Sequence, residues 1–201
     1  MDRLYYLAEQ FRNAMDCAKE AGYFENEVCF KSFPKGSCGE TCYLLAEYLL
    51  DHGIYTEYVE GMNYSESQSH AWLVVADKAD LERKRNEYST SIFEHDEQKD
   101  CSNGYEFMLR AIQGKSVNDF DYTPHDYASD LHGRIIIDIT GDQFHDNPEF
   151  KYYDIPVYVG EMDDVHWLFE IKNIHECTGL DADNSYQLRN LYRIIKEYIG
   201  E

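Results

Sequence analysis

Apolar side chains recur with helical spacing at both ends of the chain. The first stripe predicts a helix over residues 3–21 that ends at Gly22, and the second predicts a helix over residues 186–199. The stripes consist of Leu4, Leu7, Ala8, Phe11, Met15 and Ala18, and of Leu188, Leu191, Ile195 and Ile199. Each helix therefore has one face that must pack against the rest of the protein.

A further helix is predicted directly after a turn-rich stretch. Ser37 is a favoured N-cap residue, and Glu40 follows three positions later, which is the spacing of a capping box. Apolar positions continue to His52, and Gly53 ends the helix. The pattern therefore places Cys38 in the first turn of this helix.

Strand patterns occupy the middle of the chain. The predicted strands are residues 54–59, 71–75, 134–140, 155–159 and 167–171. A polar segment at about 77–132 interrupts this series and is predicted to be an insertion. We therefore expect a single catalytic domain over residues 1–201 of the α+β class, with a mainly antiparallel central sheet packed on the Cys38 helix and helices flanking it.

Composition makes the protein strongly acidic. The 201 residues include 39 Asp and Glu but only 18 Lys and Arg, so the formal net charge is −21 at pH 7. Such a surface repels phosphate groups, which argues against nucleic-acid and membrane partners and favours a basic protein partner. The sequence shows no signal peptide and no apolar run near the ~20 residues of a membrane span. Its six cysteines lack CxxC pairs, so we expect free thiols in the cytoplasm.

Three residues stand where a thiol nucleophile and its helpers are needed. Cys38 opens a helix, whose partial positive charge and free N–H groups favour a thiolate. His70 enters the strand 71–75 and can take the thiol proton. Asp138 lies within the apolar strand 134–140, where a buried carboxylate needs a partner, and His70 is the natural one. We predict a catalytic triad of these three residues.

Neighbouring residues are predicted to support the triad. The backbone N–H groups of Cys38 and Gly39 would hold a developing oxyanion, and Trp72 would keep water away from the site. Gln143 and Ser69 would add polar contacts.

Other assignments remain open around the same site. Asp142 is an alternative acid to Asp138, and Arg134 is a rival partner for Asp138. Cys42 lies one helical turn after Cys38 and is expected to pack in the core.

The same motifs carry a family resemblance. Gly36-Ser37-Cys38 at a helix start, His70-Ala71-Trp72-Leu73-Val74 and Asp138-Ile139-Thr140 occur in the order that resembles the transglutaminase-like branch of the papain-like cysteine protease superfamily. The resemblance spans about residues 33–76 and 133–144, and residues 138–144 are also similar to uncharacterised bacterial proteins. It implies a papain-like core and thiol-dependent acyl transfer on a protein or peptide amide, with no cofactor.

The resemblance leaves the reaction and the substrate open. The gap between His70 and Asp138 is longer than the short hairpin of the family, because the insertion lies within it. Water as acceptor gives a peptidase or deamidase, and an amine gives a transglutaminase. The residues do not decide between these outcomes.

Two functions of other kinds are the alternatives. A non-catalytic module could keep this fold and use its acidic surface to capture a basic protein. A zinc site could use His145, His166 and His175 together with Asp142. The chain has no HExxH or CxxC spacing, so we predict no metal.

Overall fold

The structure is a computed structural model, which describes residues 1–86, 127–181 and 186–201. The chain divides into two compact units, one formed by residues 1–77 and 127–201 and the other by residues 78–126. Of the second unit only residues 78–86 are described, and they are helical. The predicted insertion at about 77–132 nearly coincides with this unit, while a single catalytic domain over the whole chain stays a prediction.

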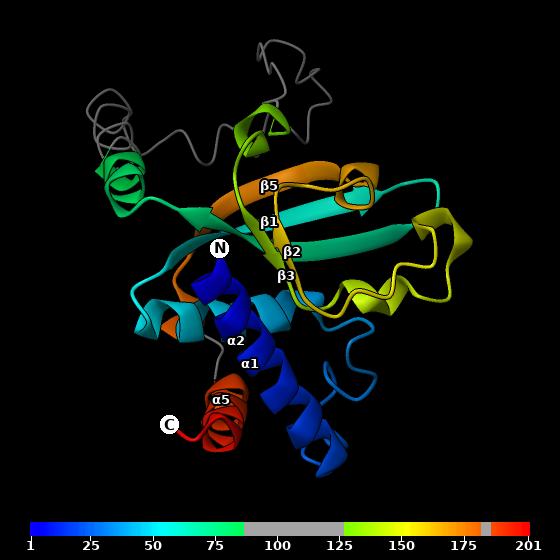
Figure 1. Cartoon of the computed structure of the whole chain (residues 1–201), viewed down its shortest axis with the longest axis vertical. Coiled ribbons are helices and arrows are strands. Elements are labelled where there is room, and N and C mark those ends of the chain that lie inside the picture. Colours follow the sequence, from blue (N-terminus) through cyan, green and yellow to red (C-terminus); the bar gives the residue numbers. More distant parts are fainter. Residues whose placement is uncertain (87–126, 182–185) are drawn as a thin grey trace, which may run out of the picture. The chain divides into compact units, whose positions relative to one another are not determined.

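The described residues of the first unit form three α-helices and one five-stranded sheet (Figure 1). The helices are α1 (Asp2–Glu20), α2 (Cys38–Asp51) and α5 (Tyr186–Ile199). The strands are β1 (Tyr55–Asn63), β2 (Gln68–Ala76), β3 (Ile136–Asp138), β4 (Tyr158–Gly160) and β5 (Glu170–Cys177). Short 3₁₀ helices lie before, between and after the later strands: η1 (Ser129–Leu131), η2 (Gly141–Phe144), η3 (Pro148–Phe150), η4 (His166–Leu168) and η5 (Gly179–Asp181). The predicted α+β class with an antiparallel sheet is confirmed.

The register of the sheet determines which side chains share a face. The strand order is β4-β3-β2-β1-β5, and every neighbouring pair is antiparallel. Leu73 pairs with Ile137, so the next step along the same register places Asp138 beside Trp72. Because alternate residues of a strand point to the same face, His70 lies on that face too. The register thereby brings His70 and Asp138 together.

The two faces of the sheet carry separate cores. α1, α2 and α5 lie on one face, where Ala71 and Leu73 of β2 join the larger apolar cluster (Figure 1). Trp72 and Val74 alternate with them and join a second cluster, together with Phe144, Phe150 and Phe169. Gly61 of β1 lets this second cluster close, because a Cβ there would lie 2.7 Å from Cβ of Phe169. The site therefore has a packed aromatic wall.

Several predicted elements are shorter than expected. The run 134–140 is a strand only at Ile136–Asp138, because the Asp138 carboxylate accepts the Thr140 N–H at 2.8 Å and turns the chain out of the sheet. The strand expected at 155–159 is Tyr158–Gly160. The strand expected at 167–171 begins only at Glu170, after the 3₁₀ helix η4.

The start of α2 also differs from the prediction. No capping box forms, because the Ser37 hydroxyl donates to the Pro34 carbonyl at 2.9 Å instead of accepting a backbone N–H of the helix. The Ser37 carbonyl does accept the first helical hydrogen bond, from Thr41 N–H at 2.9 Å. Cys38 is nevertheless the first residue of the helix, as predicted.

The predicted helices at the two ends are confirmed within one or two residues. Their apolar stripes enter the larger core, where Phe11, Met15, Leu191 and Ile195 are buried. None of the helices in the described part of the chain is long and apolar enough to cross a membrane.

Candidate active site

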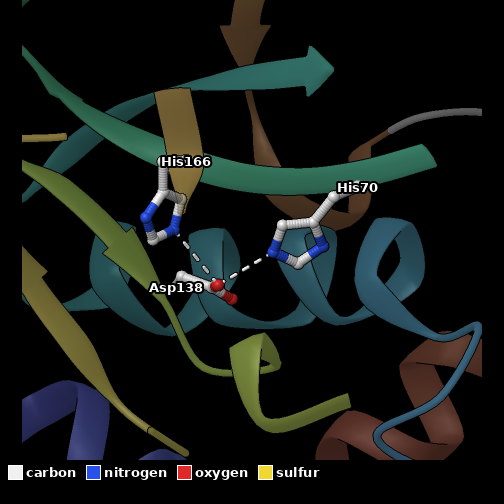
Figure 2. Close-up of side chains that lie close together, drawn as sticks. All are labelled: His70, Asp138 and His166. Atoms are coloured by element: carbon white, nitrogen blue, oxygen red, sulfur yellow. Dashed lines mark hydrogen bonds and ion pairs between the residues drawn. The ribbon is translucent and has the colours of Figure 1, made fainter. Parts of the chain in front are cut away.

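His70 and Asp138 form a buried hydrogen-bonded pair (Figure 2). His70 Nε2 lies 2.8 Å from Asp138 Oδ2, and both residues are 2% exposed. The ring of His70 is packed between Trp72 and Phe144, with centroid separations of 5.5 and 5.0 Å. A charged group buried away from water needs an oppositely charged or hydrogen-bonded partner, so Asp138 and His70 have to pair in the folded protein.

Two further donors hold the other carboxylate oxygen in place. Asp138 Oδ1 accepts from the Thr140 backbone N–H at 2.8 Å and from the Thr140 hydroxyl at 3.1 Å. Burial raises the pKa of Asp138, but the charge of His70 and the hydrogen bonds from His166 and His70 outweigh it and hold the pKa well below its ordinary value. Asp138 is therefore ionised and held in place beside His70.

Cys38 approaches His70 from the start of α2. The residue is half-buried, and its thiol interacts with the His70 side chain and with the Ala71 backbone N–H. Burial raises the pKa of the thiol, but the hydrogen bond and charge of His70 and the Ala71 N–H lower it more, so the pKa lies below its ordinary value. Cys38 therefore adjoins the His70–Asp138 pair through His70, and the catalytic triad of the three residues stays a prediction.

The second nitrogen of His70 contacts Gln143. Gln143 Nε2 lies 3.0 Å from His70 Nδ1 and 3.0 Å from the Thr140 carbonyl, while its Oε1 accepts from Gly36 N–H at 3.4 Å. Those two backbone contacts orient the amide so that its NH₂ group faces Nδ1. In this orientation Gln143 can donate to Nδ1 only when the His70 ring is neutral and carries its proton on Nε2.

Two influences oppose each other at His70. Burial lowers the pKa of His70, but the charge of Asp138 and its hydrogen bonds with Asp138 and Cys38 outweigh it and raise the pKa to about 10. Gln143 acts in the opposite direction, because its donated hydrogen bond is available only to the neutral ring. His70 Nδ1 thus has two arrangements: it accepts from Gln143, or it carries a proton that it shares with Cys38.

The other predicted supporting residues lie on the same elements as Cys38 and His70, namely α2 and β2. Trp72 is fully buried beside His70. Gly39 follows Cys38 in the first turn of α2, where N–H groups have no acceptor within the helix. Ser69 is exposed at the beginning of β2. Cys42 packs in the core as predicted, and burial raises the pKa of its thiol well above the ordinary value.

The two rival assignments at this site are wrong. Arg134 does not pair with Asp138, because its guanidinium donates to Glu57 and to the Val75 carbonyl. Asp142 does not contact His70, because it accepts two hydrogen bonds from Arg12, at 2.9 and 2.7 Å. Of the two candidate acids, Asp142 is thus occupied by Arg12, and Asp138 is the carboxylate that contacts His70.

Arg12 is a buried residue that sequence reasoning missed. It lies on α1 and also donates to the Ile139 carbonyl at 2.7 Å and to the Pro156 carbonyl at 3.1 Å. It therefore fastens the segment between Asp138 and Gln143 to the helix layer. Its signal was a charge inside the apolar stripe of the first helix, a position that requires buried partners.

A second histidine, His166, completes the surroundings of Asp138 (Figure 2). Its Nε2 lies 3.3 Å from Asp138 Oδ2, on the other side of the carboxylate from His70. Of the four residues in the zinc alternative, only His166 joins the one group of possible ligands found among the described residues, which it forms with His70 and Asp138. His145 lies instead beside Asp146 and the Asp142 carbonyl, so the zinc set is not assembled.

Ligand atoms of the three clustered residues lie within 4.8 Å of one another, a spacing that a metal ion could also use. Hydrogen bonds already account for the arrangement, because Nε2 of His70 and Nε2 of His166 each lie at hydrogen-bonding distance from Asp138 Oδ2. The five cysteines in the described part of the chain are all free thiols, and only Cys38 has a histidine partner.

Comparison with known proteins adds no assignment. Scans of protein-family models, of curated proteins and of solved structures found no significant match to this chain. The case for a function therefore rests on the geometry of the cluster, and the transglutaminase-like resemblance stays a prediction.

Proposed function

We propose that the protein is a thiol-dependent acyl-transfer enzyme that acts on an amide bond of a protein or peptide, with Cys38, His70 and Asp138 as its catalytic triad. The observation that carries this proposal is the chain of contacts from the half-buried Cys38 to His70 and on to Asp138, with 2.8 Å between His70 Nε2 and Asp138 Oδ2. The proposal includes a papain-like core, with the nucleophile at a helix start and its partners on a sheet.

In the acylation step, His70 Nδ1 takes the proton of the Cys38 thiol, and the thiolate attacks the amide carbonyl carbon. Asp138 keeps the second ring proton on Nε2, so that Nδ1 is free to accept. Backbone N–H groups of Cys38 and Gly39 donate to the oxyanion of the tetrahedral intermediate. The C–N bond then breaks as His70 returns its proton to the leaving nitrogen, and a thioester on Cys38 remains.

The second step resolves the thioester. Water gives up a proton to His70 and attacks the thioester carbonyl, which releases a carboxylic acid and restores the thiol. An amine in place of water gives a new amide. Trp72 and Phe144 surround the His70 ring and exclude bulk water from this end of the site, which strengthens the interactions of the charged pair.

An activated ester tests this proposal without knowledge of the substrate. With p-nitrophenyl acetate, we expect repeated release of nitrophenol and an acetyl group on Cys38 that mass spectrometry detects. Cys38→Ala should lower the rate by at least about 100-fold, because the nucleophile is gone. Cys17→Ala is the matched control, since Cys17 is exposed on α1 and should leave the rate unchanged. Turnover that survives in Cys38→Ala would contradict the proposal.

The acidic surface supports the alternative function. A net charge of −21 favours capture of a basic protein, and this function does not need the thiol. It becomes the better account if Cys38 titrates as an ordinary thiol and the protein nevertheless retains a polylysine peptide in a salt-sensitive way.

A further inference from the structure

His166 holds a fixed position behind Asp138 (Figure 2). It is the first residue of η4 and is 1% exposed. Its ring packs against Trp72 of β2 and Tyr158 of β4, with centroid separations of 5.2 and 5.3 Å. This packing fixes the ring with both of its nitrogens at hydrogen-bonding distance from carboxylates.

The two partners of His166 determine its charge. Nδ1 lies 2.7 Å from Asp163 Oδ1, and Nε2 lies 3.3 Å from Asp138 Oδ2. A carboxylate oxygen only accepts, so both ring nitrogens must carry a proton to make both contacts. A neutral imidazole has one N–H and would turn a lone pair toward one of the carboxylates. Making both hydrogen bonds at once therefore requires an imidazolium.

Asp163 is built to remain ionised. Its Oδ1 also accepts from the backbone N–H groups of Val165 at 2.9 Å and His166 at 3.0 Å, and its Oδ2 accepts from the Tyr153 hydroxyl at 2.9 Å. Burial raises the pKa of Asp163, but the hydrogen bond and charge of His166 and the other donors lower it to about 2. The Asp163 carboxylate beside His166 Nδ1 is thus surrounded by hydrogen-bond donors.

The groups that face His166 come from every element packed against it. They are His70 of β2, Asp138 of β3, Tyr158 of β4, and Asp163 and Tyr153 of the connecting segments. Burial raises the pKa of both tyrosines, so they stay neutral. Burial lowers the pKa of His166, but its contacts with the two carboxylates outweigh it and leave the pKa above its ordinary value.

We propose that His166 is a positioning residue that stays protonated and restrains the basicity of His70 by sharing Asp138 Oδ2 with it. This inference rests on the proposed function of the triad. Asp138 Oδ2 divides its negative charge between two donors, and the ring centroids of the two histidines are 6.2 Å apart. The His166 cation therefore opposes a second positive charge on His70.

The consequence concerns proton return during the reaction. Asp138 alone would make His70 a very strong base, which would hold its proton rather than pass it to the leaving nitrogen. A positive charge on His166, on the far side of Asp138, makes the pKa of His70 lower than it would be with Asp138 alone. Gln143, which donates to His70 Nδ1, acts in the same direction.

Nitrogen NMR of the histidine rings tests the charge directly. In the wild-type protein at pH 7, we expect both ring nitrogens of His166 to show the shifts of protonated imidazole nitrogens. The signals of His166 are those missing from the spectrum of His166→Gln. If that variant folds poorly, selective labelling of His166 assigns them instead. The charge is decided by the wild-type spectrum in either case. A His166 ring with a single proton would overturn the inference.

The effect on His70 is tested in His166→Gln, where the amide can still donate to Asp138 but carries no charge. We expect the pKa of His70 to rise by about one unit or more, because a nearby like charge is lost. Mere loosening of the site would expose His70 and move its pKa the opposite way, toward the ordinary ~6.5. His145→Gln is the matched control, since His145 is exposed, and should leave His70 unchanged. An unchanged or lower pKa of His70 in folded His166→Gln would overturn the inference.

These results separate the inference from the proposed function. Both readouts come from histidine spectra and do not require Cys38 to react. If Cys38 is unreactive while His166 is protonated and lowers the pKa of His70, the proposed enzyme function is rejected and the proposed role of His166 is retained. If Cys38 is reactive while His166 is neutral, the proposed enzyme function is retained and the proposed role of His166 is rejected.

Discussion

Replacing Asp138 with asparagine is expected to lower the rate of acyl transfer by about 10³–10⁴-fold. The asparagine oxygen would keep the Thr140 N–H as its donor, so its NH₂ group would face His70 Nε2. His70 would then have to accept at Nε2 and carry its proton on Nδ1, toward Cys38. Such a ring cannot take the thiol proton. The measurement is nitrophenol release from p-nitrophenyl acetate.

A matched control separates this effect from loss of one negative charge. Asp146→Asn removes an exposed carboxylate that pairs only at the surface with Lys35 and His145. Its rate should stay near that of the wild type, because exposed ion pairs contribute little. An Asp138→Asn enzyme that is folded by near-UV circular dichroism and works within tenfold of the wild type would show that Asp138 does not orient the base.

Replacing Arg12 with methionine is expected to lower the free energy of unfolding by about 3–5 kcal/mol. Methionine fills much of the space but removes the donors to Asp142 and to the carbonyls of Ile139 and Pro156. The Asp142 carboxylate and two carbonyls would then lack their partners in a mostly buried place. Urea unfolding of the variant and the wild type measures the difference.

Arg193→Met is the control for this loss. Arg193 forms an exposed pair with Glu197 one turn along α5, at 3.5 Å, so its removal should cost no more than about 0.5 kcal/mol. The double variant Arg12→Met with Asp142→Leu should recover part of the stability, since the stranded carboxylate is gone. A loss below about 1 kcal/mol for Arg12→Met alone would mean that Arg12 does not fasten this segment.

The triad residues could be found from the sequence because each lies beside a strong local signal. Cys38 follows a turn and opens a helix, and His70 enters an apolar strand. The carboxylate of Asp138 inside an apolar run required a partner. The pairing of His70 with Asp138 then follows from the strand register, since a slip by one residue would turn Asp138 to the opposite face.

His166 and Arg12 could not be assigned in the same way. His166 meets Asp138 only because a segment of 3₁₀ helices and the short strand β4 folds back across 28 positions, and Arg12 meets Asp142 across 130 positions. Local patterns do not encode such contacts. The weak signals were the charge on a buried helix face for Arg12 and the Asp163 carboxylate three residues before His166, a spacing typical of side-chain capping.

The ends of the strands were missed for a similar reason. Apolar residues predict a strand up to Thr140, but the side chain of Asp138 replaces a ladder hydrogen bond and turns the chain two residues earlier. That turn has a function in the site, because the following residues form η2 and bring Gln143 to His70. The mismatch between apolar pattern and strand thus falls at the candidate active site itself.

The most direct test of the central claim is the pH dependence of iodoacetamide alkylation at Cys38 in the wild type and in His70→Ala. Mass spectrometry resolves each thiol, and exposed Cys17 serves as the internal reference. We predict a Cys38 pKa below the ordinary ~8.5 that rises in His70→Ala, where burial and the charge of Asp138 still raise it and only the Ala71 N–H still lowers it. An ordinary Cys38 pKa that is the same in both proteins would contradict the account, because no working thiol–imidazole pair would then exist.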